Sequence, residues 1–133
     1  MRRVVWLMVM ALLLASVSVQ AGDVREHPVF DTPLTDAPGE HMTVTTVTYA
    51  PGAKSAPHYH NRAVFVYVLA GVVRSQIAGQ PVRLYHAGDS WFESPGDHHV
   101  ICENASATRS AKFLVVYVGI ARGHAVHTNN VNT

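Results

Sequence analysis

The sequence predicts an all-β fold, an antiparallel sandwich or small barrel, for most of its 133 residues. Short stretches rich in Val, Thr and aromatic residues alternate with turns built from Gly, Pro and Asp, spaced roughly seven to twelve residues apart. No stretch beyond the first 21 residues shows the period of an amphipathic helix. Regularly spaced short strands without helices are typical of sandwiches and barrels.

The composition indicates one folded domain. Hydrophobic residues make up 48% of the chain and charged residues only 14%, which a disordered chain would not show. The length suits a single core. The formal net charge is +1 and the basic residues are scattered rather than clustered, so a nucleic-acid partner is not expected.

Residues 1–21 have the three zones of a secretory signal peptide. Arg2 and Arg3 precede an uninterrupted apolar run over residues 4–15, and a polar taper ends at Ala21, after which cleavage is expected. An uncleaved membrane anchor is the alternative, but this run is shorter than the ~20 residues that span a bilayer. We therefore expect an exported protein with no membrane contact after cleavage.

Cys102 is the only cysteine, so the chain forms no internal disulfide. Export without disulfides suits a bacterial periplasm at least as well as a eukaryotic exterior. Because Cys102 lies in an apolar stretch, we expect a small buried hydrophobic residue rather than a reactive thiol.

The mature chain divides into three parts. Residues 22–40 hold several prolines and show no strand period, so they are expected to form an arm or edge segment. Residues 41–118 form the β domain, in which the apolar run 63–71 predicts a strand buried on both faces. Residues 119–133 form a polar tail, in which His124 and His127 are expected to be solvated. The other strands are predicted at residues 41–50, 72–77, 82–85, 90–93, 98–102 and 111–118.

Three histidines are the candidate functional residues. His58 and His60 follow a turn and, at i and i+2 of a strand, point to the same face. His99 comes three residues after Gly96, and its turn and strand can carry it across the barrel to face that pair. Neighbouring His98 points to the opposite face from His99, so the two cannot both be ligands.

These histidines lie in two motifs by which the chain resembles the cupins. Residues 72–87 separate the motifs, and the resemblance spans residues 41–118. It implies an antiparallel double-sheet β-barrel, or jelly roll. The matching residues are Gly52, His58, His60 and Gly71 in the first motif, and Gly88, Gly96 and His99 in the second.

The chain departs from both motifs. Val64 stands where the first motif has a glutamate. In the second motif, Ser94 takes the proline position with Pro95 beside it, and Glu103 takes the asparagine position with Asn104 beside it. The first departure removes an anionic metal ligand, so a bound ion would keep its full charge and an extra open position.

The resemblance implies one divalent transition metal held by His58, His60 and His99. Neutral imidazoles bind such metals, and three protein ligands leave open positions for water or substrate. Fe(II) is the first expectation, with Zn, Cu, Ni or Mn as alternatives.

Glu93 and two aromatic residues are the other candidates. Glu93 lies close to the second motif and, if it faces inward, could be a fourth ligand or a general base; otherwise it is an exposed strand carboxylate. Tyr67 and Trp91 are candidate walls of a substrate pocket, although aromatic residues in a barrel core need no function.

Three functions follow from these candidates. The first is a small-molecule metalloenzyme of dioxygenase type, because cupins with three histidines include such enzymes. The second is a non-catalytic cupin that binds a metal or small ligand, and the third is a Zn-dependent hydrolase or lyase that uses Glu93 or a tyrosine as base. The resemblance also implies a homodimer formed through edge strands.

Overall fold

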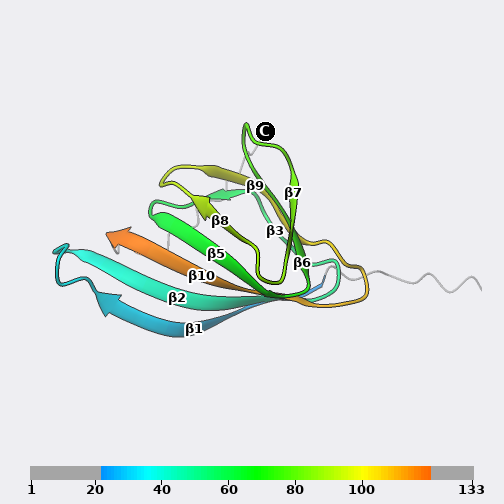
Figure 1. Ribbon diagram of the computed structural model, residues 1–133, viewed down its shortest axis with the longest axis horizontal. Coiled ribbons are helices and arrows are strands. Elements are labelled where there is room, and N and C mark those ends of the chain that lie inside the picture. The colour runs from blue at the N-terminus through cyan, green and yellow to red at the C-terminus, as the bar shows by residue number, and fades with distance from the viewer. Residues whose placement is uncertain (1–21, 121–133) are drawn as a thin grey trace, which may run out of the picture.

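The structure, a computed structural model that describes residues 22–120, is all β, which confirms the predicted fold class. Its strands form two antiparallel sheets that approach each other at one end of the molecule and splay apart at the other (Figure 1). The large sheet has the order β1-β2-β10-β5-β8, and the small sheet has the order β3-β9-β6-β7, with β4 also paired to β9. The strands are β1 (Val24–Pro33), β2 (Glu40–Tyr49), β3 (Lys54–Ser55), β4 (His58–Tyr59), β5 (Ala63–Ala70), β6 (Val72–Ile77), β7 (Arg83–His86), β8 (Ser90–Glu93), β9 (His98–Asn104) and β10 (Ala111–Ile120).

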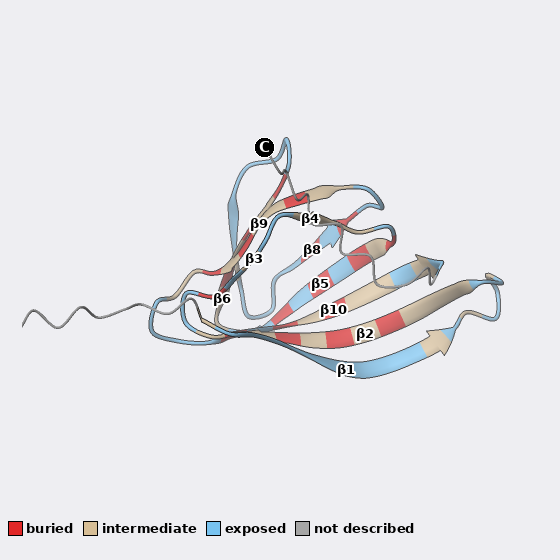
Figure 2. Ribbon diagram, turned by 180° about the vertical axis from the view of Figure 1, so that it is seen from behind, coloured by how far each residue is buried: buried red, intermediate tan, exposed pale blue. Residues whose placement is uncertain are grey.

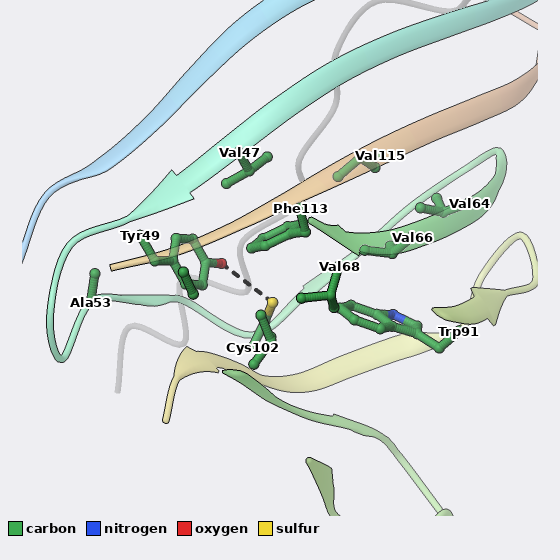
Figure 3. Packing of buried hydrophobic residues seen from close by; sticks show 12 residues of the cluster. Val47, Tyr49, Ala53, Val64, Val66, Val68, Trp91, Cys102, Phe113 and Val115 are labelled. Atoms are coloured by element: carbon green, nitrogen blue, oxygen red, sulfur yellow. Dashed lines mark hydrogen bonds between the residues drawn. The ribbon is translucent and has the colours of Figure 1, made fainter. Parts of the chain in front are cut away.

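The core lies between the two sheets. Tyr49 packs edge-on against Phe113, with ring centroids 5.1 Å apart, and donates a hydrogen bond to the Cys102 thiol at 3.3 Å (Figure 3). Cys102 is 6% exposed, as expected of a buried hydrophobic residue. Trp91 closes the cluster from β8, with its centroid 6.2 Å from that of Phe113.

Strand β5 differs from its prediction. Its side chains alternate, with Val64, Val66 and Val68 buried while the intervening residues, among them Phe65 and Tyr67, are exposed. The prediction of a strand buried on both faces is therefore wrong. An unbroken apolar run does not reveal burial when the solvent face of the strand is itself apolar.

Segment 22–40 contains β1, which pairs along its length with β2 at the edge of the large sheet. Nearly every residue of β1 is exposed (Figure 2). Because neither face is buried, the sequence has no alternation there that would predict a strand.

Strand β9 carries one extra residue. Gln76 and Ile77 of β6 pair with Ile101 and His99, so Val100 is the additional residue of a bulge. The bulge shifts the inward face by one position, and Asn104 is therefore the buried residue in place of Glu103. The Asn104 side-chain amide donates to the backbone carbonyls of nearby loops and strands, which explains why the asparagine lies one position beyond its expected place.

An apolar row crosses the outer face of the large sheet. Its members are consecutive cross-strand partners, one on each strand, and we call them the outer row: Phe30, Val44, Val116, Phe65 and Phe92. The three phenylalanines are 52%, 42% and 58% exposed in that order. The outer face of the large sheet thus carries one apolar row on the side that points away from the core.

Several predictions concern residues outside the described range. The signal peptide at residues 1–21 and the tail histidines His124 and His127 lie outside it, so export and a periplasmic location stay predictions. Strand β10 continues to Ile120, two residues into the segment predicted to be a tail. Within residues 22–120 no helix is long and apolar enough to cross a bilayer.

Candidate functional site

A cavity of about 370 Å³ lies between the inner faces of the two sheets and includes all three predicted histidines in its walls. Side chains of both sheets line it, so it is formed by the fold as a whole. Its size is that of a small-molecule site. The lining residues on which the chemistry depends are His58, His60, Arg62, Glu93, His99 and Tyr117.

The three histidine rings lie side by side. His58 on β4 is the cross-strand partner of His99 on β9, and their ring centroids are 5.1 Å apart. The ring of His60, just after β4, lies 4.7 Å from that of His58. The amide of Gly96 donates to the His60 carbonyl at 2.8 Å, which fixes the turn before β9 against the chain that carries the other two rings.

His98 lies on the other side of β9. Its ring stacks on Tyr59 at 4.2 Å with an interplanar angle of 11°, whereas His99 is only 3% exposed and faces the cavity. Only His99 of this pair can therefore take part in the site.

Glu93 on β8 faces inward and is 1% exposed, so the interpretation as an exposed strand carboxylate is wrong. Its Oε1 accepts a hydrogen bond from Trp91 Nε1 at 2.9 Å and lies 3.1 Å from His99 Nδ1. Its Oε2 is buried without a hydrogen-bond partner among the described residues and lies 3.8 Å from His60 Nε2. One carboxylate oxygen is thus anchored and the other is free.

Glu93 is also the cross-strand partner of Val64, the residue at the missing glutamate position. Both are 1% exposed and both line the cavity. Directly opposite residues of antiparallel strands have Cβ atoms about 5 Å apart. The carboxylate that is absent from β5 is therefore supplied by the neighbouring strand.

Burial sets the protonation of the first two histidines. It lowers the pKa of His58 and brings the pKa of His60 to about 4, so both rings are neutral at pH 7. The Ala56 carbonyl accepts the Nδ1 proton of His58 at 2.7 Å, which leaves Nε2 as its unprotonated nitrogen. Neutral imidazole nitrogens are what a transition metal requires.

Glu93 and His99 form a charged pair. Burial, the largest influence on both, opposes their ionisation, but the hydrogen bonds of Glu93 with His99 and Trp91 lower the pKa of its carboxyl. For His99, the influence of neighbouring Cys102 and Glu93 outweighs burial and raises its pKa to about 10. His99 therefore carries a second proton in the metal-free protein.

The donor set fits a divalent transition metal, although it is not arranged as a coordination shell. Within residues 22–120 no group of three or more His, Cys, Asp or Glu side chains has the geometry to hold an ion. Both ring nitrogens of His99 are engaged, because Nε2 lies 2.8 Å from Ser75 Oγ while Nδ1 faces Glu93. Two neutral imidazoles and a partnerless buried carboxylate oxygen are nonetheless ligands such an ion prefers. His99 would join them on losing its second proton.

Residues 45–117 match the family described as Cupin domain, which is more than half of the chain. The chain is a cupin.

Other similarities agree with this fold. The cupin is 35% identical over 79 residues to (R)-mandelonitrile lyase of Granulicella tundricola, a match that covers 59% of this chain and 56% of that protein. An RmlC-like cupin from Methanocaldococcus jannaschii superposes with a TM-score of 0.59 at 14% identity, over 85% of this chain and 94% of the other. The DMSP lyase DddQ from Ruegeria pomeroyi gives a TM-score of 0.55 at 23% identity, over 62% and 40%. The chain thus spans little more than half the length of the curated relative that it matches.

Of the two predicted pocket aromatics, one lies in the cavity wall. Trp91 is 8% exposed, lines the cavity and holds Glu93. Tyr67 is 39% exposed on the outer face of β5 and does not line the cavity, so its predicted place is wrong. The reason is that side chains of β5 alternate between the two faces of the sheet, so Tyr67 points outward because its neighbours Val66 and Val68 point inward.

Sequence reasoning missed three polar residues of the site: Arg62, Ser75 and Tyr117. Arg62 comes two residues after His60, which alone signals nothing. Tyr117 is the cross-strand partner of Val64 and places its ring centroid 5.4 Å from that of His60. These neighbours follow from strand register, and no local motif announces them.

Proposed function

We propose that this cupin is a metal-dependent lyase that acts on a small organic molecule, with Glu93 as the base. The observation that supports the proposal most is the free Oε2 of Glu93, buried in the wall of the cavity beside His60. The lyases among the similar proteins agree with it. A fixed, ionised carboxylate out of bulk water is suited to accept a proton from a bound substrate.

His58, His60 and His99 would hold the metal, with Fe(II) the first choice and Zn, Cu, Ni or Mn as alternatives. When bound, the ion supplies Lewis acidity toward an oxygen or nitrogen of the substrate. Glu93 Oε1 accepts the Nδ1 proton of His99, which orients the ring, and Nε2 would hold the ion in place of its present contact with Ser75 Oγ. Glu93 thus has a positioning role through one oxygen and a chemical role through the other.

In the proposed reaction Glu93 Oε2 accepts a proton from the substrate. The electron pair that remains on the substrate forms a double bond as the bond to the leaving group breaks, and the leaving group departs with that bond's electrons. Protonated Glu93 then returns its proton to the leaving group. The Trp91 N–H stays on Oε1 throughout and keeps the carboxylate in place. Burial raises the pKa of Tyr117 to about 12, so its hydroxyl remains protonated as a further donor in the cavity.

The buried base distinguishes this proposal from the other candidates. Dioxygenase chemistry, the activity first expected from the resemblance, depends on molecular oxygen rather than on a carboxylate base. A non-catalytic metal-binding cupin would use Glu93 Oε2 only as a ligand of the ion and would convert no substrate, so the activity of Glu93 variants separates the two.

The test compares the wild type with Glu93→Gln and with Glu103→Gln, a control carboxylate that pairs with Arg74 away from the cavity. The first probe is mandelonitrile, assayed for benzaldehyde by absorbance with and without oxygen, alongside elemental analysis of each protein. We expect oxygen-independent turnover that falls roughly 10²- to 10⁴-fold in Glu93→Gln at equal metal content. Glu103→Gln should match the wild type.

Three results would redirect the assignment. Full activity of Glu93→Gln would remove Glu93 as the base. Turnover that requires oxygen would favour the dioxygenase, and metal-loaded protein that binds small molecules without converting any would favour the binding cupin.

A further inference from the structure

Arg62 is a buried cation without a carboxylate partner among residues 22–120. It is only 8% exposed. All nine Asp and Glu residues of the chain lie within the described range, and none of them forms an ion pair with Arg62. Its Nη1 donates to Thr43 Oγ1 at 3.1 Å, and that hydroxyl in turn donates to Asp31 Oδ2 at 2.6 Å. Arg62 therefore reaches the Asp31 carboxylate only through the Thr43 hydroxyl.

The guanidinium lies beside the proposed reaction centre. Its central carbon is 5.1 Å from the centroid of the Tyr117 ring, the same ring that contacts His60. Arg62, His60 and Tyr117 all line the one cavity. No guanidinium nitrogen is among the buried atoms that lack a partner, so the nitrogens that do not donate to Thr43 keep contact with solvent.

A charge this deeply buried needs more than these contacts. Removing an ion from water costs more than one cation–π contact and one hydrogen bond to a neutral hydroxyl restore. The remaining donors form a planar fork that matches a carboxylate in two parallel hydrogen bonds. An anion from outside the chain would supply the missing partner.

The other charges of the cavity limit what that anion is. Glu93 lies on the same cross-strand row as Thr43 and Tyr117. Its negative charge repels a second anion close to it. A compact anion with one negative charge therefore suits the site better than a phosphate with two. Glu26 also lines the cavity, and its charge, like that of Glu93, acts on Tyr117. Arg62 is the cation that contacts Tyr117, so an incoming anion is expected at its guanidinium and away from both cavity carboxylates.

We infer that Arg62 binds the carboxylate group of the substrate, so that small carboxylic acids whose reacting carbon lies toward Glu93 are the preferred substrates of this cupin, and mandelonitrile, which has no carboxylate, is a weaker one. The orientation of the reacting carbon rests on the proposed function. Binding of the carboxylate does not, because it requires neither the metal nor the base.

The test measures binding in metal-free, chelator-treated protein by isothermal titration calorimetry. The probes are benzoate and its uncharged isostere benzamide. We compare the wild type with Arg62→Met, with Arg62→Lys, and with Lys54→Met, which removes the other non-histidine cation of the cavity wall. Circular dichroism checks the fold of each variant.

We expect benzoate to bind the wild type and Lys54→Met equally, and to bind Arg62→Met roughly 10- to 100-fold more weakly. Arg62→Lys, which keeps the charge without the fork, should fall between them. Benzamide should bind at least roughly tenfold more weakly than benzoate to the wild type. If Arg62→Met does not fold, the Arg62→Lys result and the benzamide comparison decide the question.

Undiminished benzoate binding by Arg62→Met or Arg62→Lys, equal binding of benzamide, or no binding of benzoate to the wild type would each overturn the inference. Because no metal is present, none of these results bears on Glu93 or the lyase reaction. Conversely, an inactive enzyme that binds benzoate through Arg62 would refute the proposed function alone.

Discussion

Exchanging the cross-strand partners Val64 and Glu93 tests whether they share one space in the cavity. The two positions are both 1% exposed, with Cβ atoms expected about 5 Å apart. Val64→Glu alone would place two carboxylates at that distance, which costs about 3 kcal/mol at an effective dielectric constant near 20. Glu93→Val alone would leave His99 without its buried counter-charge, which costs about 3–5 kcal/mol.

The double variant carries one carboxylate again, on the other strand. It loses the hydrogen bond from Trp91, worth about 1 kcal/mol, but it avoids the repulsion and returns an anion to the vicinity of His99. We expect the two single changes to sum to about 6–8 kcal/mol and the double variant to cost only about 1–3 kcal/mol relative to the wild type.

Urea denaturation of the metal-free proteins at pH 7 measures the four free energies of unfolding. Metal titration of the same proteins should show the parallel pattern, with affinity weakened roughly 10- to 100-fold in Glu93→Val and largely restored in the exchange. A double variant as unstable as the sum of the single changes would refute the reasoning, because the two side chains would then not occupy interchangeable positions.

His99→Ala should abolish metal retention while His98→Ala, whose ring lies on the other face of β9, stays near stoichiometric in elemental analysis; the reverse pattern would overturn the ligand assignment. The pKa of Asp31 is lowered chiefly by its hydrogen bond from Thr43, so its stabilising effect is present above pH 3.8 and is lost as the pH falls through the lowered value. Thr43→Val should raise that pKa toward 3.8 in an NMR titration, and an unchanged value would show that the hydroxyl is not responsible. The homodimer expected from the resemblance stays a prediction; if it forms through the outer row, Phe92→Lys should convert it to a monomer in light scattering, and an unaffected dimer would place the interface elsewhere.

Local patterns predicted the strands whose two faces differ, because burial on one face leaves an alternation in the sequence. They failed at β1, which has no buried face, and at β5, whose outer face is as apolar as its inner one. His58, His60 and His99 were expected to converge from opposite sides of the barrel, but β4 pairs with β9, so His58 and His99 are neighbours within the small sheet.

The rest of the site was not predictable in the same way. The alternation of β8 places Glu93 and Trp91 on one face of the strand and Phe92 on the other. It does not show which face points to the core, since each face carries an aromatic residue. Arg62 and Tyr117 acquire their neighbours from the register between strands distant in sequence, which propensity and spacing do not encode.

The pairing of Val64 with Glu93 has a consequence for how such sites are recognised from sequence. A search that requires a glutamate at a fixed distance after the two histidines would reject this chain, although the structure holds a carboxylate in the adjoining place. What a reaction needs is a charge at a point in space, and in an antiparallel sheet two positions far apart in the chain can supply it. Patterns for sites of this kind should therefore be written over pairs of facing positions rather than along one segment.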